Sequence, residues 1–162
     1  MYELARKFHG ECSFVNAIVI QETKELAQGI LSSKYFETLR DAWKGLDLAV
    51  VGIGGEIDEE NKQWFDMLTQ KDFQQIKENH IVGDLCCRFF NTSGQETIVD
   101  LSERTIAISY EELKRVPISL AVVSGKEKAQ AILAVLRQRL VNYLVIDYDT
   151  MISVLELDSA DE

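Results

Sequence analysis

The sequence has 162 residues, the size of one domain with a sizeable core. Its 46% hydrophobic and 27% charged residues are near globular averages, which excludes a wholly disordered chain. The formal net charge of −10 argues against nucleic-acid binding by these residues, because affinity for phosphate backbones depends on Lys and Arg.

The N-terminal sequence and the cysteines indicate a cytoplasmic protein. Residues 1–6 lack the basic and apolar regions of a signal peptide, and no apolar run approaches membrane-spanning length. The three cysteines, Cys12, Cys86 and Cys87, contain no CxxC pair, and reduced thiols suit the cytosol. We interpret them as small buried hydrophobes and expect no membrane contact.

The first part of the chain predicts a βαβ unit. It begins with what resembles the end of a helix, stopped at Gly10. The β-branched residues of Phe14–Ile20 then predict a buried strand. Amphipathic helices are expected at Thr23–Leu31 and Lys34–Trp43, before a strand at Leu46–Val51. This order predicts parallel strands with a right-handed crossover.

The middle of the chain mixes helical and strand patterns. Glu56–Asn79 is polar with apolar stripes at helical spacing, and Leu85–Phe90 predicts a strand that ends in turn chemistry at Asn91–Gly94. Ser109–Glu112 has the form of a capping box opening a short helix, which Pro117 helps to end. Two short strands, Thr97–Val99 and Thr105–Ile108, are expected between this turn and the capping box.

The last part of the chain has the clearest pattern. Strands are predicted at Ile118–Val123 and Tyr143–Ile146, on either side of a helix at Lys126–Leu140 with one apolar face. A final helix is expected at Asp149–Leu155, and residues 158–162 read as a solvated acidic tail. The class is therefore α/β, without internal repeats or linkers.

The predicted strand at Leu46–Val51 runs into a glycine-rich loop. After Asp47 its apolar residues are continuous, as in a strand buried on both faces of a parallel sheet. Gly52, Gly54 and Gly55 follow, and ligands of open α/β sheets bind beyond the carboxyl ends of the strands. A GxGG loop here is either a tight turn or a ligand cradle, and it is not a Walker loop.

Other polar groups are expected near the same edge of the sheet. Ser124–Lys128 begins a helix, where free N–H groups and two lysines favour a phosphate or carboxylate. Alternatively, Ser124 and Glu127 form a capping box. Asp147 ends a strand and Asp84 stands at the turn entering another. These two carboxylates would hold sugar hydroxyls, or serve as turn or helix-capping aspartates.

Catalytic sets are poorly represented. His9 and His80 stand near predicted helix ends without an HxxxH or HxH partner, so neither a zinc site nor a His-based triad is supported. The nucleophile motif GxSxG is also absent from the sequence. We therefore assign no catalytic residue, no metal ligand and no cofactor.

Four strings of the sequence resemble a known family in their order and spacing. They are VGIGG, IVGDLCCRFFNTSG, ERTIAISYEELKRVP and VVSGKEKAQAILAVLRQRLVNYLVID. Together they are similar to the effector-binding domain of SorC-type (DeoR/sugar-binding) bacterial transcription regulators, over nearly the whole chain. The resemblance implies a Rossmann-like, three-layer α/β/α fold with a mostly parallel sheet, like the group of glucosamine-phosphate isomerase, ribose-phosphate isomerase and CoA-transferase.

The resemblance also implies a function for residues 1–157. Such domains sense a phosphorylated sugar or related metabolite within a homo-oligomer, a dimer or a tetramer. Two glycines would form the backbone of the ligand loop, two aspartates would lie near sugar hydroxyls, and the lysine of a GxxK segment would meet a phosphate. The implied ligand-binding residues are Gly54, Gly55, Asp84, Gly125, Lys128 and Asp147.

The sequence departs from the family at several places. Operator DNA is bound in the family through an N-terminal helix-turn-helix, which these residues do not contain. The family's first strand and its Gly/Thr-rich phosphate-binding loop are expected before Leu4 and Ala5, so we expect a domain that lacks its N-terminal part. Cys87 stands where a glycine is common in the family.

Two further functions are compatible with the pattern. An enzyme acting on sugar phosphates, related to the isomerases or deaminases, would need a positioned general base and would turn substrate over. An oligomerisation module that has lost its ligand would assemble without any response to metabolites. The ligand-sensing domain is the reading that the resemblance favours.

Overall fold

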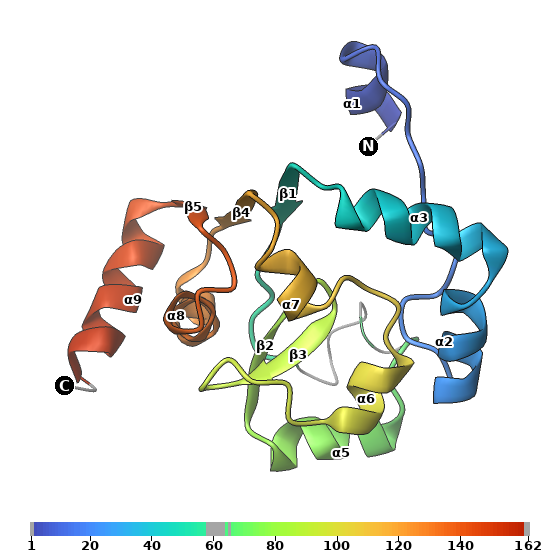
Figure 1. Cartoon of the computed structure of the whole chain (residues 1–162). Coiled ribbons are helices and arrows are strands. Elements are labelled where there is room, and N and C mark those ends of the chain that lie inside the picture. The colour runs from blue at the N-terminus through green and yellow to red at the C-terminus, as the bar shows by residue number, and fades with distance from the viewer. Residues whose placement is uncertain (1, 58–63, 65, 161–162) are drawn as a thin grey trace.

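The described residues form two small β-sheets (Figure 1). The computed structural model describes residues 2–57, 64 and 66–160. Strands β1 (Leu48–Val51), β4 (Ile118–Val123) and β5 (Tyr143–Ile146) form a parallel sheet in the order β1-β4-β5. Strands β2 (Ile81–Leu85) and β3 (Arg88–Asn91) form an antiparallel hairpin. The fold is therefore mixed α/β with a mostly parallel sheet, as the sequence predicts.

Helices pack against the hairpin and against one face of the parallel sheet, and several begin at side-chain caps. The bounds of the helices are α1 (Tyr2–Lys7), α2 (Lys24–Leu31), α3 (Lys34–Lys44), α5 (Gln70–Glu78), α6 (Val99–Arg104), α7 (Tyr110–Leu113), α8 (Ala129–Arg137) and α9 (Tyr148–Ala160). A 3₁₀ turn, η1 (Lys126–Lys128), precedes α8. The side chains of Thr23, Ser33, Thr69 and Ser109 each accept a backbone N–H from the first turn of their helix. The capping box predicted at Ser109–Glu112 is confirmed.

Three clusters of buried side chains hold the elements together. Core 1 joins the inner face of the parallel sheet to α7, α8 and α9, and its residues include Ile53, Leu85, Leu113, Ala121, Val123, Ile132 and Val154. Core 2 lies between the hairpin, α5 and α6, and its residues include Ile57, Trp64, Phe73, Ile76, Ile81, Phe89 and Leu101. A smaller cluster packs α2 against α3. The hairpin separates cores 1 and 2 because its alternate side chains point into each.

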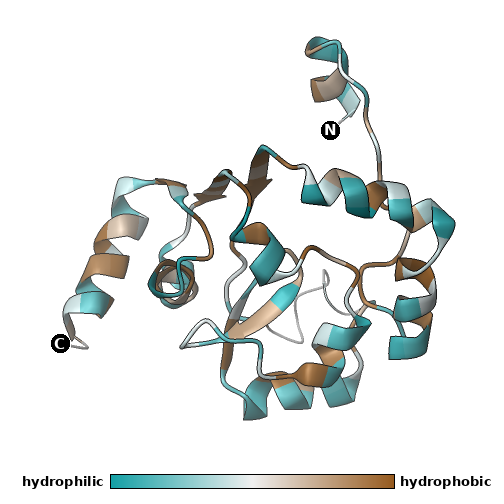
Figure 2. Ribbon diagram, in the orientation of Figure 1, coloured by the Kyte–Doolittle hydropathy of each residue, from teal (hydrophilic) through white to brown (hydrophobic). Residues whose placement is uncertain are grey.

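The opposite face of the parallel sheet is exposed. Side chains of β1, β4 and β5 alternate between the inner face and this outer face, and Val50 is 62% exposed. The prediction that this strand is buried on both faces is wrong, because α7 and α8 pack on one side only (Figure 1). Figure 2 shows the three strands as strongly apolar segments.

Three predicted strands are not formed. Within Phe14–Ile20 only Ile20 makes a bridge, an isolated one to Thr105, so the segment has high β-propensity but no neighbouring strand. The same bridge is all that forms in Thr105–Ile108, and Val99 of the third predicted strand begins α6. The predicted βαβ unit at the start of the chain therefore lacks its first strand.

The predicted strand Leu85–Phe90 is interrupted by a turn. Cys86 and Cys87 have φ of 56° and 60° and form the two-residue loop between β2 and β3. Positive φ at both central residues is the geometry of a type I′ hairpin turn, which favours glycine and asparagine. Two cysteines gave no such signal in the sequence. The predicted turn at Asn91–Gly94 is confirmed, with φ of 71° at Gly94.

Three predicted helices have different bounds. Within Glu56–Asn79 the described residues include α5 and a helical Trp64, and residues 58–63 and 65 lie outside the described residues. The helix predicted from Lys126 starts as a 3₁₀ turn and ends at Arg137. The final helix runs on to Ala160, so the first residues of the expected acidic tail are helical, and Asp158 pairs with Arg137.

Candidate functional site

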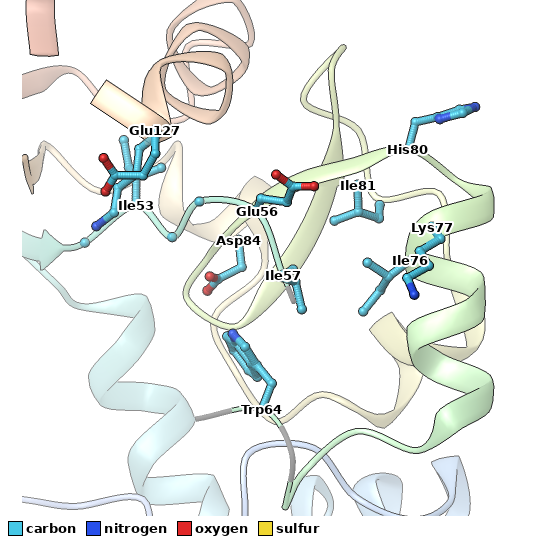
Figure 3. A pocket seen from close by; sticks show the side chains of 14 residues that line it. Ile53, Glu56, Ile57, Trp64, Ile76, Lys77, His80, Ile81, Asp84 and Glu127 are labelled. Carbon is cyan, nitrogen blue, oxygen red and sulfur yellow. The ribbon is translucent and has the colours of Figure 1, made fainter. Parts of the chain in front are cut away.

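A cavity of about 1090 Å³ lies between the carboxyl end of β1, the end of η1 and the β2–α5 region (Figure 3). Its lining residues are Gly52, Ile53, Gly54, Gly55, Glu56, Ile57, Trp64, Ile76, Lys77, His80, Ile81, Asp84, Glu127 and Lys128. Its position matches the general rule that ligands of open α/β sheets bind beyond the carboxyl ends of the strands.

The glycines of the GxGG loop permit close packing of the loop against β2. The Gly54 N–H donates to the carbonyl of Asp84 (2.9 Å), next to an isolated bridge between Ile53 and Leu85. A Cβ on Gly54 would overlap the Asp84 carboxylate, and one on Gly83 would overlap the Gly54 carbonyl. Positive φ is not found in the loop, since Gly94 and Gly125 are the glycines of the described residues that adopt it. Close approach, not a tight turn, therefore requires glycine here.

Asp84 projects into the cavity from β2 (Figure 3). It lies within the strand, so the prediction that it stands at a turn entering a strand is wrong. Burial raises the pKa of its carboxyl to about 6, and the Cys87 N–H (3.2 Å) and the positive charge of Lys128 partly oppose this rise. Asp84 is therefore a carboxylate at the cavity wall whose pKa of about 6 is closer to neutral pH than that of a free aspartate.

Lys128 reaches the cavity from the end of η1. A Cβ on Gly55 would lie 3.0 Å from Lys128 Cγ, so the aliphatic stem of the lysine passes directly over the glycine loop. The ammonium group is close enough to lower the pKa of Asp84. A carboxylate and an ammonium group from separate elements thus face one cavity across a glycine backbone.

Gly125 and Asp147 are not among the lining residues. Asp147 caps α9: its carboxylate accepts the N–H (3.0 Å) and the hydroxyl (2.5 Å) of Thr150. These hydrogen bonds hold the pKa of Asp147 far below its usual value. Gly125, with φ of 124°, donates its N–H to the same Thr150 oxygen (2.9 Å). The helix-capping alternative therefore describes what Asp147 does in this structure.

The alternative capping box of Ser124 and Glu127 is not observed, since Gly125 takes the N-cap position of η1 without a side-chain hydrogen bond. Glu127 instead lines the cavity. Together with Glu56 it adds negative charge at the same site as Lys77 and Lys128. Grouped His, Cys, Asp or Glu side chains that could hold a metal ion are not found in the part of the chain that the structure describes.

A family model described as "Putative sugar-binding domain" matches residues 1–156. The chain belongs to this family of sugar-binding domains. The sorbitol operon regulator of Klebsiella pneumoniae is 28% identical over 92% of this chain and 47% of its own length. The predicted resemblance to SorC-type and DeoR-type regulators is confirmed at the level of the family.

Solved structures of the family have the same fold. A transcriptional regulator from Streptococcus pneumoniae TIGR4 superposes with a TM-score of 0.94 at 54% identity, over 98% of this chain and 60% of that one. The full-length sorbitol operon regulator SorC from K. pneumoniae gives 0.84 at 28% identity, over 95% and 49% of the two chains. This chain therefore spans about half the length of the curated relatives it matches.

The sugar-binding domain has one cavity wall that sequence reasoning missed. This wall comes from α5 and its flanks and holds Trp64, Ile76, Lys77 and His80. The apolar residues of this stretch show only helical spacing, and His80 follows the end of α5 with φ of 50°. Nothing in the local sequence distinguishes a core residue that also borders a cavity.

Among the residues with a described structure, every helix is too short or too polar to cross a lipid bilayer.

Proposed function

We propose that this chain is the effector-binding part of a bacterial transcription regulator of carbohydrate metabolism, and that its effector is a phosphorylated sugar or a related metabolite. The observation that carries the proposal is the meeting of Asp84 and Lys128 beside the Gly54–Gly55 backbone in one large cavity. The family and the regulators related to this chain support it.

Each group has a distinct role in this proposal. The Lys128 ammonium group attracts a phosphate as a compact positive charge. The Asp84 carboxylate accepts hydrogen bonds from sugar hydroxyls, and loop N–H groups add donors to an anion. The site binds its effector without turnover, whereas an isomerase or deaminase relative would convert it.

The rest of the proposal concerns the whole regulator. Residues 1–157 form the effector domain of a cytoplasmic homo-oligomer, a dimer or a tetramer, and operator DNA is bound through a helix-turn-helix that these 162 residues do not contain. The effector regulates DNA binding because it has different affinities for two arrangements of the oligomer.

Thermal unfolding against a panel of sugar phosphates and free sugars tests the effector site. An effector at a hundredfold its Kd stabilises the folded state by about 2.7 kcal/mol, a shift of several degrees in Tm. We expect one class of phosphorylated sugar to give this shift and Lys128→Ala to abolish it.

Lys126→Ala is the matched control, because Lys126 lies in the same 3₁₀ turn, is not among the cavity-lining residues and pairs with Asp149. It should keep the shift. A shift that survives Lys128→Ala, or a panel with no stabilising compound, would contradict the proposed site. Chemical conversion of the stabilising compound would favour the enzyme.

A further inference from the structure

A second cavity, of about 600 Å³, lies between α3, the end of α2 and residues of β3 and α7. We call it the α3 cavity. The lining residues that matter here are Leu31, Phe36, Arg40, Trp43, Arg88 and Glu112. Its lining is separate from that of the cavity of Asp84 and Lys128. Its volume is typical of small-molecule sites, which measure about 300 to 1,000 Å³.

Arg40 and Trp43 bring to this cavity two donors that the fold does not use. They are three residues apart on α3, so they lie on the same face of the helix. Within the described residues, the half-buried guanidinium of Arg40 makes no hydrogen bond or ion pair, and the indole N–H of Trp43 has no acceptor. Arg88, by contrast, donates to Glu96 and to two backbone carbonyls. Arg40 and Trp43 are therefore the donors that can bind an acceptor on a ligand.

Glu112 limits the charge of such a ligand. Its carboxylate accepts the backbone N–H (2.9 Å) and the hydroxyl (2.7 Å) of Ser109. Burial alone would raise the pKa of Glu112, but these hydrogen bonds and the nearby Arg88 and Arg115 lower the pKa below its ordinary value. The wall thus keeps one negative charge at neutral pH. This charge repels a phosphate, which carries about −1.5 to −2, more strongly than a carboxylate, which carries one charge.

The rest of the wall is apolar and partly aromatic. Phe36 is fully buried, and the ring of Trp43 meets it edge to face, with centroids 5.3 Å apart and planes at 86°. This contact holds the indole in one orientation. Leu31 adds an aliphatic side chain to the wall. A flat aromatic body fits such a wall, because aromatic rings gain from edge-to-face and offset contacts as well as from burial.

We propose that the α3 cavity is a second ligand site, which binds small aromatic monocarboxylates. The ligand carboxylate accepts two parallel hydrogen bonds from the Arg40 guanidinium, whose planar fork matches its geometry. The Trp43 N–H donates to the same group, and the ring of the ligand packs against Leu31 and the indole. The inference does not rest on the proposed effector, since the two cavities have different walls.

The indole N–H signals of the ¹⁵N-labelled chain test this site. The chain has two tryptophans, Trp43 at the α3 cavity and Trp64 in core 2. A Trp43→Phe variant assigns the two signals in ¹H–¹⁵N spectra. Benzoate and indole-3-acetate are the probes. We expect each to move the Trp43 signal saturably, because its N–H gains an acceptor, and to leave the Trp64 signal in place.

Arg40→Met should weaken benzoate binding about tenfold or more, because a charge-assisted hydrogen bond is lost while the aliphatic stem is kept. Lys44→Met is the matched control: Lys44 is a cation on the same helix, pairs with Asp41 and is not a lining residue, so this variant should bind like the parent. Benzamide, which is neutral, and phenyl phosphate, which is nearly a dianion, should both bind more weakly than benzoate.

Three results would overturn the inference. They are unchanged benzoate binding by Arg40→Met, movement of the Trp64 signal in place of the Trp43 signal, and no saturable shift with either probe. Tighter binding of phenyl phosphate than of benzoate would overturn the assignment to monocarboxylates.

Discussion

Asp84 is the residue at which folding and binding make opposite demands. Its carboxylate is partly withdrawn from water at the cavity wall, where it lies so close to Gly54 that a Cβ on that residue would overlap it. Desolvation raises its pKa from 3.8 to about 6, so the ionised form is costly in the folded state. A ligand hydroxyl that donates to this carboxylate would reduce the cost.

Asp84→Asn should stabilise the chain at neutral pH. Because the folded-state pKa is the higher one, the cost of ionisation is absent below about pH 4, grows as the pH rises to 6, and reaches up to about 3 kcal/mol at pH 7. Asparagine avoids this cost and can still accept the Cys87 N–H. Urea unfolding measures the free energy of unfolding at pH 7, where Asp84 is ionised, and at pH 4, where it is protonated in the folded chain. Asp41→Asn, at an exposed position, is the control; a gain that persists at pH 4 would assign the effect to packing.

At the scale of elements, the sequence predicted the helix starts and strands that depend on interactions between neighbouring residues. Caps at Thr23 and Ser109 begin the helices expected there, and the apolar runs of β4 and β5 form strands at the predicted residues. Phe14–Ile20 has the same strand propensity, but it forms one isolated bridge and pairs with no strand of the described residues, because strand pairing depends on the whole fold.

The end of α8 is an element whose residue choice conflicts with its geometry. The Arg139 N–H bonds to the Leu136 carbonyl and the Leu140 N–H to the Val135 carbonyl, which is the Schellman pattern. Arg139 has φ of 51°, where glycine is favoured. Its side chain is exposed, so little packing depends on it.

Arg139→Gly should therefore stabilise the chain by about 1 kcal/mol, since it removes left-handed strain from a side chain that makes little contact. Urea denaturation measures the change. Arg115→Gly is the comparison, because Arg115 is exposed and does not have positive φ. Equal effects of the two substitutions would count against backbone strain as the cause.

At the scale of the molecule, part of the site could be predicted from the order of strands and helices that the sequence indicates. Gly54, Gly55 and Lys128 follow strands or begin helices at one edge of a parallel sheet, so their meeting could be expected. Trp64 and His80 could not be found in this way, because the hairpin and core 2 bring them to the cavity through long-range packing.

The buried pair of Arg104 and Asp72 joins three distant segments. Arg104 donates to Asp72 on α5 (2.5 Å) and to the Gln21 carbonyl (2.9 Å), and both charged side chains are almost fully buried. Arg104→Met should cost about 3–5 kcal/mol, because it leaves a buried carboxylate without its cation. Chemical denaturation measures the loss, and Arg137→Met, which breaks the exposed pair with Asp158, should cost about 1 kcal/mol or less. Similar losses in both variants would contradict this role for burial.

The cavity has one wall on each of two separately packed cores. Ile53 belongs to core 1, while Ile57, Trp64 and Ile81 belong to core 2, and Asp84 lies on the hairpin between them. A compound that spans the cavity contacts residues of both cores and so restricts their movement relative to each other. A compound too short to reach the far wall can occupy one side and leave the cores free to shift. Molecular length thus becomes a criterion of selection in addition to charge.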